Sequence, residues 1–279
     1  GGITGTKLAA DANVILDGQS ASDRFGISVA SAGDFNGDGK SDVIVGADLR
    51  TNNVGNEGNA YIFFGGVTGS KRANDDADVI IKGNGNGDNL GNSVSSAGDF
   101  NGDGKGDVIV GERNGQNESN IRTGRAYIFF GGVTGTKTAE TDADVILNGQ
   151  SANDEFGNTV ASAGDFNGDG KDDVIIGAPG DDNNSASNSG SAFIFFGGIT
   201  GTKTADADAD VILNGESADD EFGGNAFNGI GGRSLGAGDF NGDGTSDVII
   251  GAGEDGNNSA SRSGSAFIFF SSGALPSIT

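Results

Sequence analysis

The stretch Asp34-Phe-Asn-Gly-Asp-Gly-Lys-Ser-Asp42 decides the fold of this chain, because it returns almost unchanged three more times. The other copies run from Asp99 to Asp107, from Asp165 to Asp173 and from Asp239 to Asp247. In each copy, oxygen-bearing side chains stand at positions 1, 3, 5 and 9, and a glycine at position 6 allows a sharp turn. Four copies within 279 residues indicate a repeat protein.

The alternating oxygen side chains predict a calcium loop. A Ca²⁺ ion takes about six to eight oxygen ligands, and a chain wrapped around it presents alternate side chains plus a main-chain carbonyl near position 7. Four Ca²⁺ sites are therefore expected, with the position-7 residue contributing its carbonyl. Their predicted ligands are Asp34, Asn36, Asp38, Lys40 and Asp42; Asp99, Asn101, Asp103, Lys105 and Asp107; Asp165, Asn167, Asp169, Lys171 and Asp173; and Asp239, Asn241, Asp243, Thr245 and Asp247.

The loop has two alternative interpretations. The EF-hand begins with the same spacing but closes with a bidentate glutamate at position 12. Here position 12 is an aliphatic residue within a short β-branched run, which predicts a buried strand after the loop (Val45, Val110, Ile176 and Ile250). The second alternative is an Asn/Gly turn that binds nothing. Three carboxylates within nine residues of every copy favour a cation, because like charges repel without one.

The amino-acid composition disfavours several classes of binding partner. With 16 basic and 40 acidic residues, the formal charge of −24 disfavours nucleic acid and anionic lipid, which both need a basic patch. No apolar run approaches the ~20 residues of a membrane span, so no membrane insertion is expected. Cysteine is absent and gives no information on redox compartment. The lack of methionine and of a signal peptide suggests a processed chain or a fragment.

The repeat units predict an all-β fold, a β-propeller of four four-stranded blades. The loops are spaced 65, 66 and 74 residues apart, and each unit contains four short strand-like runs with glycine between them. One of these runs is strongly aromatic, as in Ala60-Tyr-Ile-Phe-Phe64. A single domain over residues 1–279 is expected, with units at about 17–82, 83–148, 149–214 and 215–279 and an N-terminal strand within 1–16.

The two ends of the chain predict how the ring closes. Val14-Ile-Leu16 resembles the strand that follows the aromatic strand in other units, whereas the last unit ends on its aromatic strand, Ala266 to Phe270. The N-terminal strand is therefore expected to complete the last blade, which would hide two open sheet edges. The alternatives are a fragment of a longer array and a homodimer that forms an eight-bladed ring. An insertion at 224–233 breaks the repeat and has no assigned role.

The motifs together resemble a known family. Phe25-Gly26, the calcium loop and Gly177-Ala178-Pro179 are similar to the FG-GAP repeat of integrin α-subunit propellers and of bacterial extracellular proteins. Gly-Ala-Pro is complete only in the third unit, and four units depart from the family's usual seven blades. The resemblance implies Ca²⁺ at loop positions 1, 3, 5, 7 and 9, and an extracellular or cell-surface recognition scaffold.

A calcium-binding adhesion or recognition propeller is accordingly the expected function, acting as a monomer or a ring-completing homo-oligomer. A glycan or protein ligand would bind the variable loops at Asp48–Asn59, Glu112–Arg125, Gly180–Ser191 and Gly253–Ser265. The alternatives are a structural unit of a surface layer or filament and, less favoured, a polysaccharide-acting enzyme. Without His and Cys, the common nucleophile and acid–base arrangements are excluded, so the chain is not expected to be an enzyme. Acidic residues outside the repeat are interpreted as surface charge (Glu112, Glu118, Glu254 and Asp255).

Overall fold

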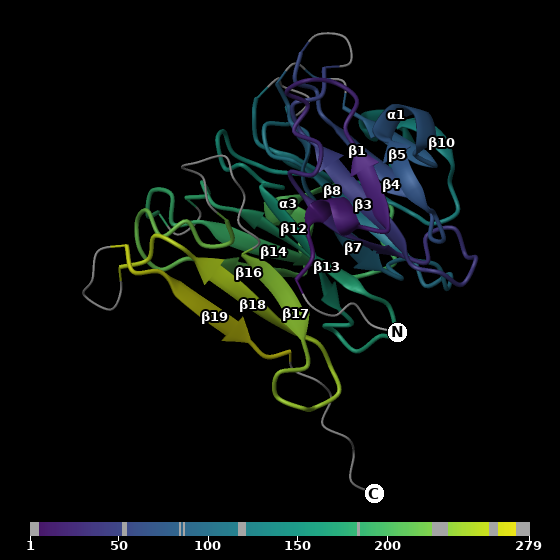
Figure 1. Cartoon of the computed structure of the whole chain (residues 1–279). Helices are drawn as coiled ribbons and strands as arrows, with labels where there is room; N and C mark the ends of the chain where they lie inside the picture. The colour runs from purple at the N-terminus through teal and green to yellow at the C-terminus, as the bar shows by residue number, and fades with distance from the viewer. Residues whose placement is uncertain are drawn as a thin grey trace, which may run out of the picture.

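Short β-branched and aromatic runs form the strands of this chain, and glycine-rich turns separate them, as the repeat pattern predicts. The structure, a computed structural model, describes residues 6–51, 55–83, 85, 87–116, 121–182, 185–224, 234–256 and 262–271. It is almost entirely β, with successive sheets stacked along the molecule (Figure 1). None of the helices within those residues is long and apolar enough to cross a bilayer. The prediction of an all-β propeller fold is confirmed.

Each of the first three blades contains four antiparallel strands, and the described part of the last blade contains three. In chain order within a blade, the first strand pairs with the second, the second with the third, and the aromatic third with the fourth. The blades are β2 (Val29–Gly33), β3 (Asp42–Ala47), β4 (Asn59–Phe63) and β6 (Val79–Lys82); β7 (Leu90–Gly98), β8 (Asp107–Glu112), β9 (Arg125–Phe129) and β11 (Val145–Asn148); β12 (Thr159–Gly164), β13 (Asp173–Ala178), β14 (Ser191–Phe195) and β16 (Val211–Asn214); and β17 (Leu235–Gly238), β18 (Asp247–Ala252) and β19 (Ser265–Phe269).

A further short strand occurs in three units, and in two of them it adds to the sheet of the preceding unit. These strands are β5 (Gly69–Arg72), β10 (Gly135–Thr138) and β15 (Gly201–Thr204), and each leads into one helical turn, α1 (Ala73–Asp76), α2 (Ala139–Asp142) or α3 (Ala205–Asp208). β10 pairs in parallel with β6, and β15 pairs in parallel with β11. With these added strands, blades one and two have five strands.

The N-terminal strand does not complete the last blade, which corrects the predicted closure. After the 3₁₀ turn η1 (Ala9–Asp11), β1 (Val14–Asp17) pairs in parallel with β5. This pairing repeats the rule seen for β6 with β10, so β1 has the place of a fourth strand. Among the described residues, β19 pairs only with β18. Figure 1 shows β1 and β5 at one end of the array and β19 at the other. The insertion at 224–233 lies outside the described residues, except for its first residue.

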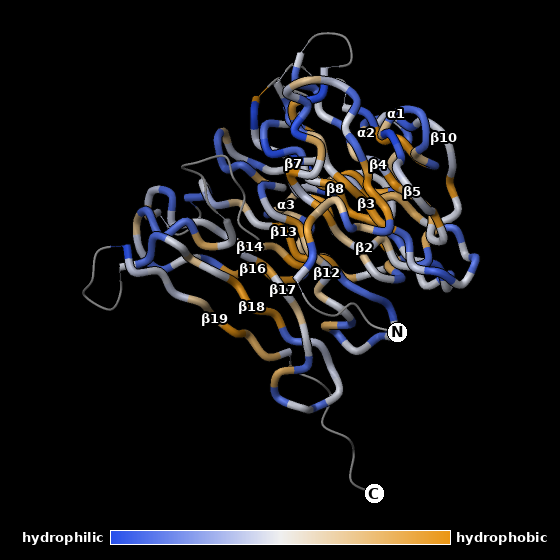
Figure 2. Tube along the Cα trace, in the orientation of Figure 1, coloured by the Kyte–Doolittle hydropathy of each residue, from blue (hydrophilic) through white to orange (hydrophobic). Residues whose placement is uncertain are grey.

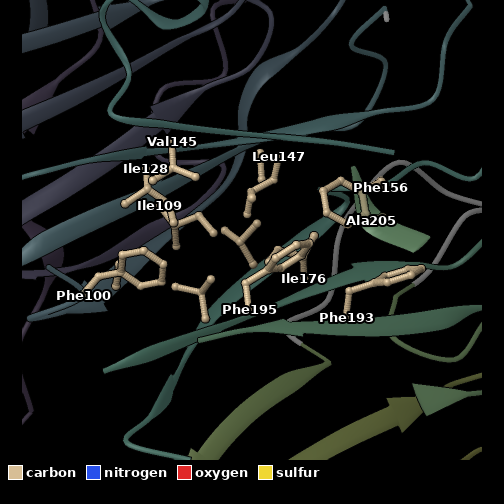
Figure 3. Packing of buried hydrophobic residues seen from close by; sticks show 14 of the residues in the cluster. Phe100, Ile109, Ile128, Val145, Leu147, Phe156, Ile176, Phe193, Phe195 and Ala205 are labelled. Carbon is tan, nitrogen blue, oxygen red and sulfur yellow. The ribbon is translucent and has the colours of Figure 1, made fainter. Parts of the chain in front are cut away.

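The hydrophobic core lies between the blades. Figure 2 shows the apolar residues concentrated on the strands and the polar residues on the loops. Between blades two and three, Phe100 and Ile128 form one cluster with Ile176 and Phe195 from the next sheet (Figure 3). Similar clusters lie between blades one and two and between blades three and four. Each blade thus buries one face against each neighbour, which is why a single unit cannot bury its apolar surface alone.

Candidate metal centre

Each predicted calcium loop connects the first two strands of a blade, and its shape depends on two glycines. In the loop between β2 and β3, Gly37 and Gly39 have φ values of +76° and +85°. The same two positions have positive φ in all four loops. Glycine adopts this left-handed conformation without a steric penalty. The Asn-Gly-Asp-Gly sequence therefore curls the chain tightly and turns its polar side chains toward the loop interior.

The side chains at positions 1, 3 and 5 are gathered by main-chain N–H groups. The N–H of Asp38 donates to Asp34 Oδ1 and to Asn36 Oδ1, both at 2.8 Å. The N–H of Lys40 donates to Asp38 Oδ1 at 2.9 Å. The other three loops repeat this arrangement. Three oxygen-bearing side chains of each predicted site are thus held on one short turn.

The position-9 aspartates have a different environment, because all four are fully buried (Asp42, Asp107, Asp173 and Asp247). Asp173 accepts hydrogen bonds from the N–H groups of Phe166 and Asn167 at the start of its loop, and of Gly197 after the aromatic strand. Burial raises the pKa of Asp173 to about 6, although these N–H groups oppose the shift and the nearby Asp169 charge adds to it. This carboxylate connects the loop to the end of β14.

The donor chemistry of the loops fits a calcium ion. All side-chain donors are oxygens, which hard divalent cations prefer. A carboxylate offers about four lone-pair positions, and Asp34 uses one on each oxygen, so it can accept further partners. Among the described residues, no three acidic side chains lie close enough together to hold an ion. The four Ca²⁺ sites and their ligands therefore stay a prediction.

Neighbouring loops are joined directly along one edge of the array. The carbonyl at position 1 of one loop accepts a hydrogen bond from the position-8 N–H of the next loop, as between Asp99 and Asp172 at 3.3 Å. The pair Asp165 and Ser246 repeats this contact at 3.2 Å. The Lys105 side chain also lies beside Gly37, where a Cβ would be 3.6 Å from Lys105 Cε. A basic position-7 side chain thus faces the acidic loop of the preceding blade.

The Phe-Gly and Gly-Ala-Pro glycines meet at the opposite edge. The N–H of Gly157 donates to the carbonyl of Gly177 in the same blade at 3.1 Å. A Cβ on Gly177 would overlap the carbonyl oxygen of Gly223 in the next blade. Phe156 packs edge-on against Phe193, with ring centroids 5.5 Å apart. Both motifs therefore serve close packing within and between blades.

The sequence interpretation missed a buried acidic residue two positions before each Phe-Gly or Leu-Gly pair (Asp23, Asp88, Asp154 and Asp220). In three units its carboxylate accepts the N–H of a serine three residues earlier, as Asp154 does from Ser151 at 2.9 Å. Burial raises the pKa of Asp154 to about 7. The signal was available in the sequence, because these three units repeat Ser-Ala-x-Asp before Phe-Gly.

The interpretation of Glu112 and Asp255 as surface charge is wrong, because both are buried. Glu112 Oε2 accepts a hydrogen bond from the Tyr127 hydroxyl at 2.8 Å. Burial, together with the nearby Asp88 charge, raises the pKa of Glu112 to about 8. Glu254 is partly covered and pairs with Arg262 at 3.0 Å. Glu118 lies outside the described residues.

Comparisons with known proteins agree with the repeat architecture. The model of the FG-GAP repeat matches residues 25–63, 90–129, 156–195 and 231–269, more than half of the chain. The chain is 31% identical over 167 residues to phosphatidylinositol-glycan-specific phospholipase D of Bos taurus, covering 58% of this chain and 18% of that protein. It is 32% identical over 173 residues to integrin alpha-PS5 of Drosophila melanogaster, covering 60% of this chain and 16% of that protein. Integrin alpha-5 of Xenopus laevis is 30% identical over 189 residues, covering 64% of this chain and 17% of that protein.

These relatives are much longer, and the chain spans less than a fifth of their length. The similarity to phospholipase D also corrects the expectation that the chain is not an enzyme. Proteins named as enzymes carry this repeat region, as integrin α chains do. The absence of His and Cys in this chain therefore carries no conclusion about catalysis.

Proposed function

The chain belongs to the FG-GAP repeat family, and on that premise we propose that it is a calcium-binding recognition or adhesion module of the extracellular space or the cell surface. The observation that supports calcium best is the oxygen-only loop, built four times with its position-1, position-3 and position-5 side chains drawn together by main-chain N–H groups. Each loop has three carboxylates at its predicted ligand positions but no glutamate at position 12, which suits the modest affinity of extracellular calcium modules.

In this proposal calcium acts as a structural ion. The carboxylates at positions 1, 5 and 9 repel one another, and a bound dication would offset that repulsion. Asp173 would coordinate from the buried side of the loop, and Asp165 and Asp169 from the exposed side. Binding would then fix the loop against the end of the aromatic strand and keep the blade edges rigid.

Native mass spectrometry in calcium and after chelation tests the metal assignment. The chain is expected to carry four Ca²⁺ ions, and the Asp169→Asn variant three, because the exposed position-5 carboxylate is lost from one loop. Asp75→Asn removes an exposed acidic residue from α1, outside the loops, and is expected to keep four ions. Loop binding would be refuted if Asp75→Asn also lost a Ca²⁺ ion, or if Asp169→Asn still carried four.

Recognition is proposed to use the loops between the second and third strands of each blade, on the edge opposite the calcium loops. The similarity to integrin α chains favours a protein as the ligand, and a glycan is the other candidate. Binding of the purified chain to a glycan array and to a panel of purified extracellular-matrix proteins, each with calcium and with chelator, separates the two classes. Signal on neither surface would argue against recognition.

A structural unit of a surface layer or filament is the second candidate function. The observation that favours it is the exposed apolar surface at both ends of the array, where Val29 is 53% and Phe270 is 60% exposed. Assembly that depends on protein concentration, together with no binding on either panel, would favour this candidate over recognition.

A further inference from the structure

The two ends of the array expose positions that are buried inside it. Val43 of β3 is 39% exposed, whereas its equivalents in the other three blades are fully buried (Val108, Val174 and Val248). We call the surface around Val29 and Val43 the leading face. At the other end, Ile268 is 48% exposed, whereas its equivalents are fully buried (Ile62, Ile128 and Ile194). We call the surface of Phe240, Ala266, Ile268 and Phe270 the trailing face.

Inside the array, a trailing face is always covered by the leading face of the next blade. Phe35 of the first blade shares a core cluster with Val108 and Phe129 of the second. Its carbonyl accepts a hydrogen bond from the N–H of Gly132 at 2.6 Å. Phe100 repeats this arrangement in the next interface, where its carbonyl accepts from the N–H of Gly198 at 2.7 Å. The equivalent phenylalanine of the last blade, Phe240, is 47% exposed.

The leading face has a pocket where this phenylalanine belongs. The pocket has a volume of about 310 Å³ and is lined by Val14, Leu16, Ser41, Val43, Phe63 and the turn at 64–67. Val43 and Phe63 are the counterparts of Val108 and Phe129, which pack with Phe35. In the same turn, Gly66 is the counterpart of the hydrogen-bond donor Gly132. The pocket therefore has the same lining residues and the same main-chain donor that surround the loop phenylalanine inside the array.

The main-chain edges at the two ends are also complementary. A fourth strand pairs with the aromatic strand of its blade in a fixed register, as Leu213 of β16 pairs with Ala192 of β14. β1 has the sequence of a fourth strand but lacks an aromatic strand beside it, and β19 is an aromatic strand without a fourth strand among the described residues. Transferring the register places Leu16 opposite Ala266 and Ile15 opposite Phe267.

We propose that a second copy of this chain docks head to tail, with its leading face on the trailing face of the first copy. β1 of one copy then extends the β17–β18–β19 sheet of the other, and Phe240 fills the pocket beside Val43. The occupant is a second copy because the chain's own β1 is held by β5 at the far end of the array (Figure 1). The proposed contact continues an interface that the array already uses three times.

Charge supports the same orientation. Lys105 lies beside Gly37 of the preceding loop, and Lys171 lies beside Gly102 in the same way. Lys40 is the first of these lysines and has no preceding loop in the chain. In the docked pair it would lie against the acidic Asp239–Asp247 loop of the other copy. The contact joins two different surfaces. It therefore forms a closed ring only if the rotations between successive copies sum to a full turn, and otherwise it forms an open head-to-tail filament.

Disulfide crosslinking tests the register, because the chain contains no cysteine of its own. The single variants Leu16→Cys and Ala266→Cys are mixed when dilute, then concentrated in calcium and oxidised. A disulfide dimer is expected in the mixture and in neither variant alone. Leu16→Cys mixed with Ile268→Cys, which is out of register by two residues, is the matched control and should crosslink at least several-fold less.

Surface variants test the two faces separately. Phe240→Asp and Val43→Asp change exposed side chains at opposite ends, and each is expected to be monomeric where the original chain associates. Mixed together, they leave one intact pair of faces and are expected to form dimers that grow no further. Ile121→Asp alters an exposed apolar residue away from both faces and should associate like the original chain.

Three outcomes would overturn the proposal. The first is an original chain that stays monomeric at high concentration. The second is a double variant, Leu16→Cys with Ala266→Cys, that forms its disulfide only within one chain, because the ring would then close on itself. The third is a crosslinked mixture in which the out-of-register control reacts equally well.

Discussion

The main-chain N–H of Gly106 donates a hydrogen bond to the carbonyl of Asp34, 3.0 Å away, and joins the second predicted calcium loop to the first. Asp34 is a predicted metal ligand through its side chain, and Gly106 precedes another predicted ligand, Asp107. Metal binding in one loop is therefore expected to affect the position of the next loop. Calcium binding and the packing of neighbouring blades are expected to depend on each other.

Calcium is expected to stabilise the fold. A ligand present at about 100 times its dissociation constant adds about 2.7 kcal/mol per site to the free energy of unfolding. Four sites would add an amount comparable to the whole stability of an ordinary domain, about 5–15 kcal/mol. Thermal unfolding followed by circular dichroism should show a melting temperature that rises with calcium and falls in chelator. An identical melting temperature in both conditions would contradict the calcium assignment.

The buried and exposed loop carboxylates should respond differently to mutation. Asp173→Ala leaves the main-chain N–H groups of Asn167 and Gly197 without their acceptor, and one such unsatisfied group costs about 1–3 kcal/mol when it is buried. The loss is therefore expected in chelator as well as in calcium. Asp169→Ala removes an exposed carboxylate of the same loop, whose hydrogen bonds water can replace, and should cost stability mainly in calcium. Urea unfolding of both variants is measured in calcium and in chelator. If both variants lose the same free energy of unfolding in chelator, the predicted difference between the two carboxylates is wrong.

The glycine of the Gly-Ala-Pro position should matter only where a further blade covers it. A Cβ on Gly111 would overlap the carbonyl oxygen of Gly157 in the next blade, whereas a Cβ on Gly251 would meet no atom of the described residues closer than 3.3 Å. Gly111→Ala is expected to destabilise the chain by about 3 kcal/mol, in the range of an overpacked core. Gly251→Ala in dilute, monomeric protein should change the urea midpoint little. A similar midpoint for both variants would argue against the inter-blade contact.

Stability should fall as the pH rises through the range in which Glu112 titrates. Burial raises the pKa of Glu112 to about 8, so the folded chain holds a proton that the unfolded chain releases near pH 4.3. Its stabilising contribution is complete below that lower value and is lost progressively as the pH approaches about 8. Glu112→Gln keeps an acceptor for the Tyr127 hydroxyl and should show a smaller decrease in unfolding free energy over this range, measured in chelator.

The matched control for this pH series is Glu216→Gln, which changes an exposed glutamate. It should retain the pH dependence of the original chain. If Glu112→Gln retains the same dependence, buried Glu112 does not contribute to it.

The parts of the fold that are coded locally could be predicted from the sequence. The Val43-Ile-Val45 run and the aromatic strand have high β-propensity of their own, and the spacing of the loop glycines predicts the turn. β10 was missed because its Gly-Thr-Lys-Thr segment pairs with β6 of another unit, and such long-range partners leave no local pattern. The place of β1 was missed for the same reason.

The burial of Glu112 could have been found by comparing the repeats. The same position holds Ala47, Ala178 and Ala252 in the other units, and small apolar residues at one position indicate a buried one. A charged residue there needs a partner, and Tyr127 in the neighbouring strand supplies it. The ligands of the calcium loops are predicted by type and spacing, but their final geometry depends on an ion that the sequence alone does not place.

The exchange of short strands between units has a consequence for how the array comes apart. β10 belongs to the second unit but completes the sheet of the first, so neighbouring blades share main-chain hydrogen bonds as well as side-chain packing. Unfolding of one blade would therefore remove an edge strand from the neighbouring sheet. The interior blades should accordingly unfold as one cooperative unit and not one after another. The last blade is joined by side chains and loops without such a strand in its described part. Amide hydrogens of β18 and β19 should accordingly exchange with solvent before those of β8 and β9.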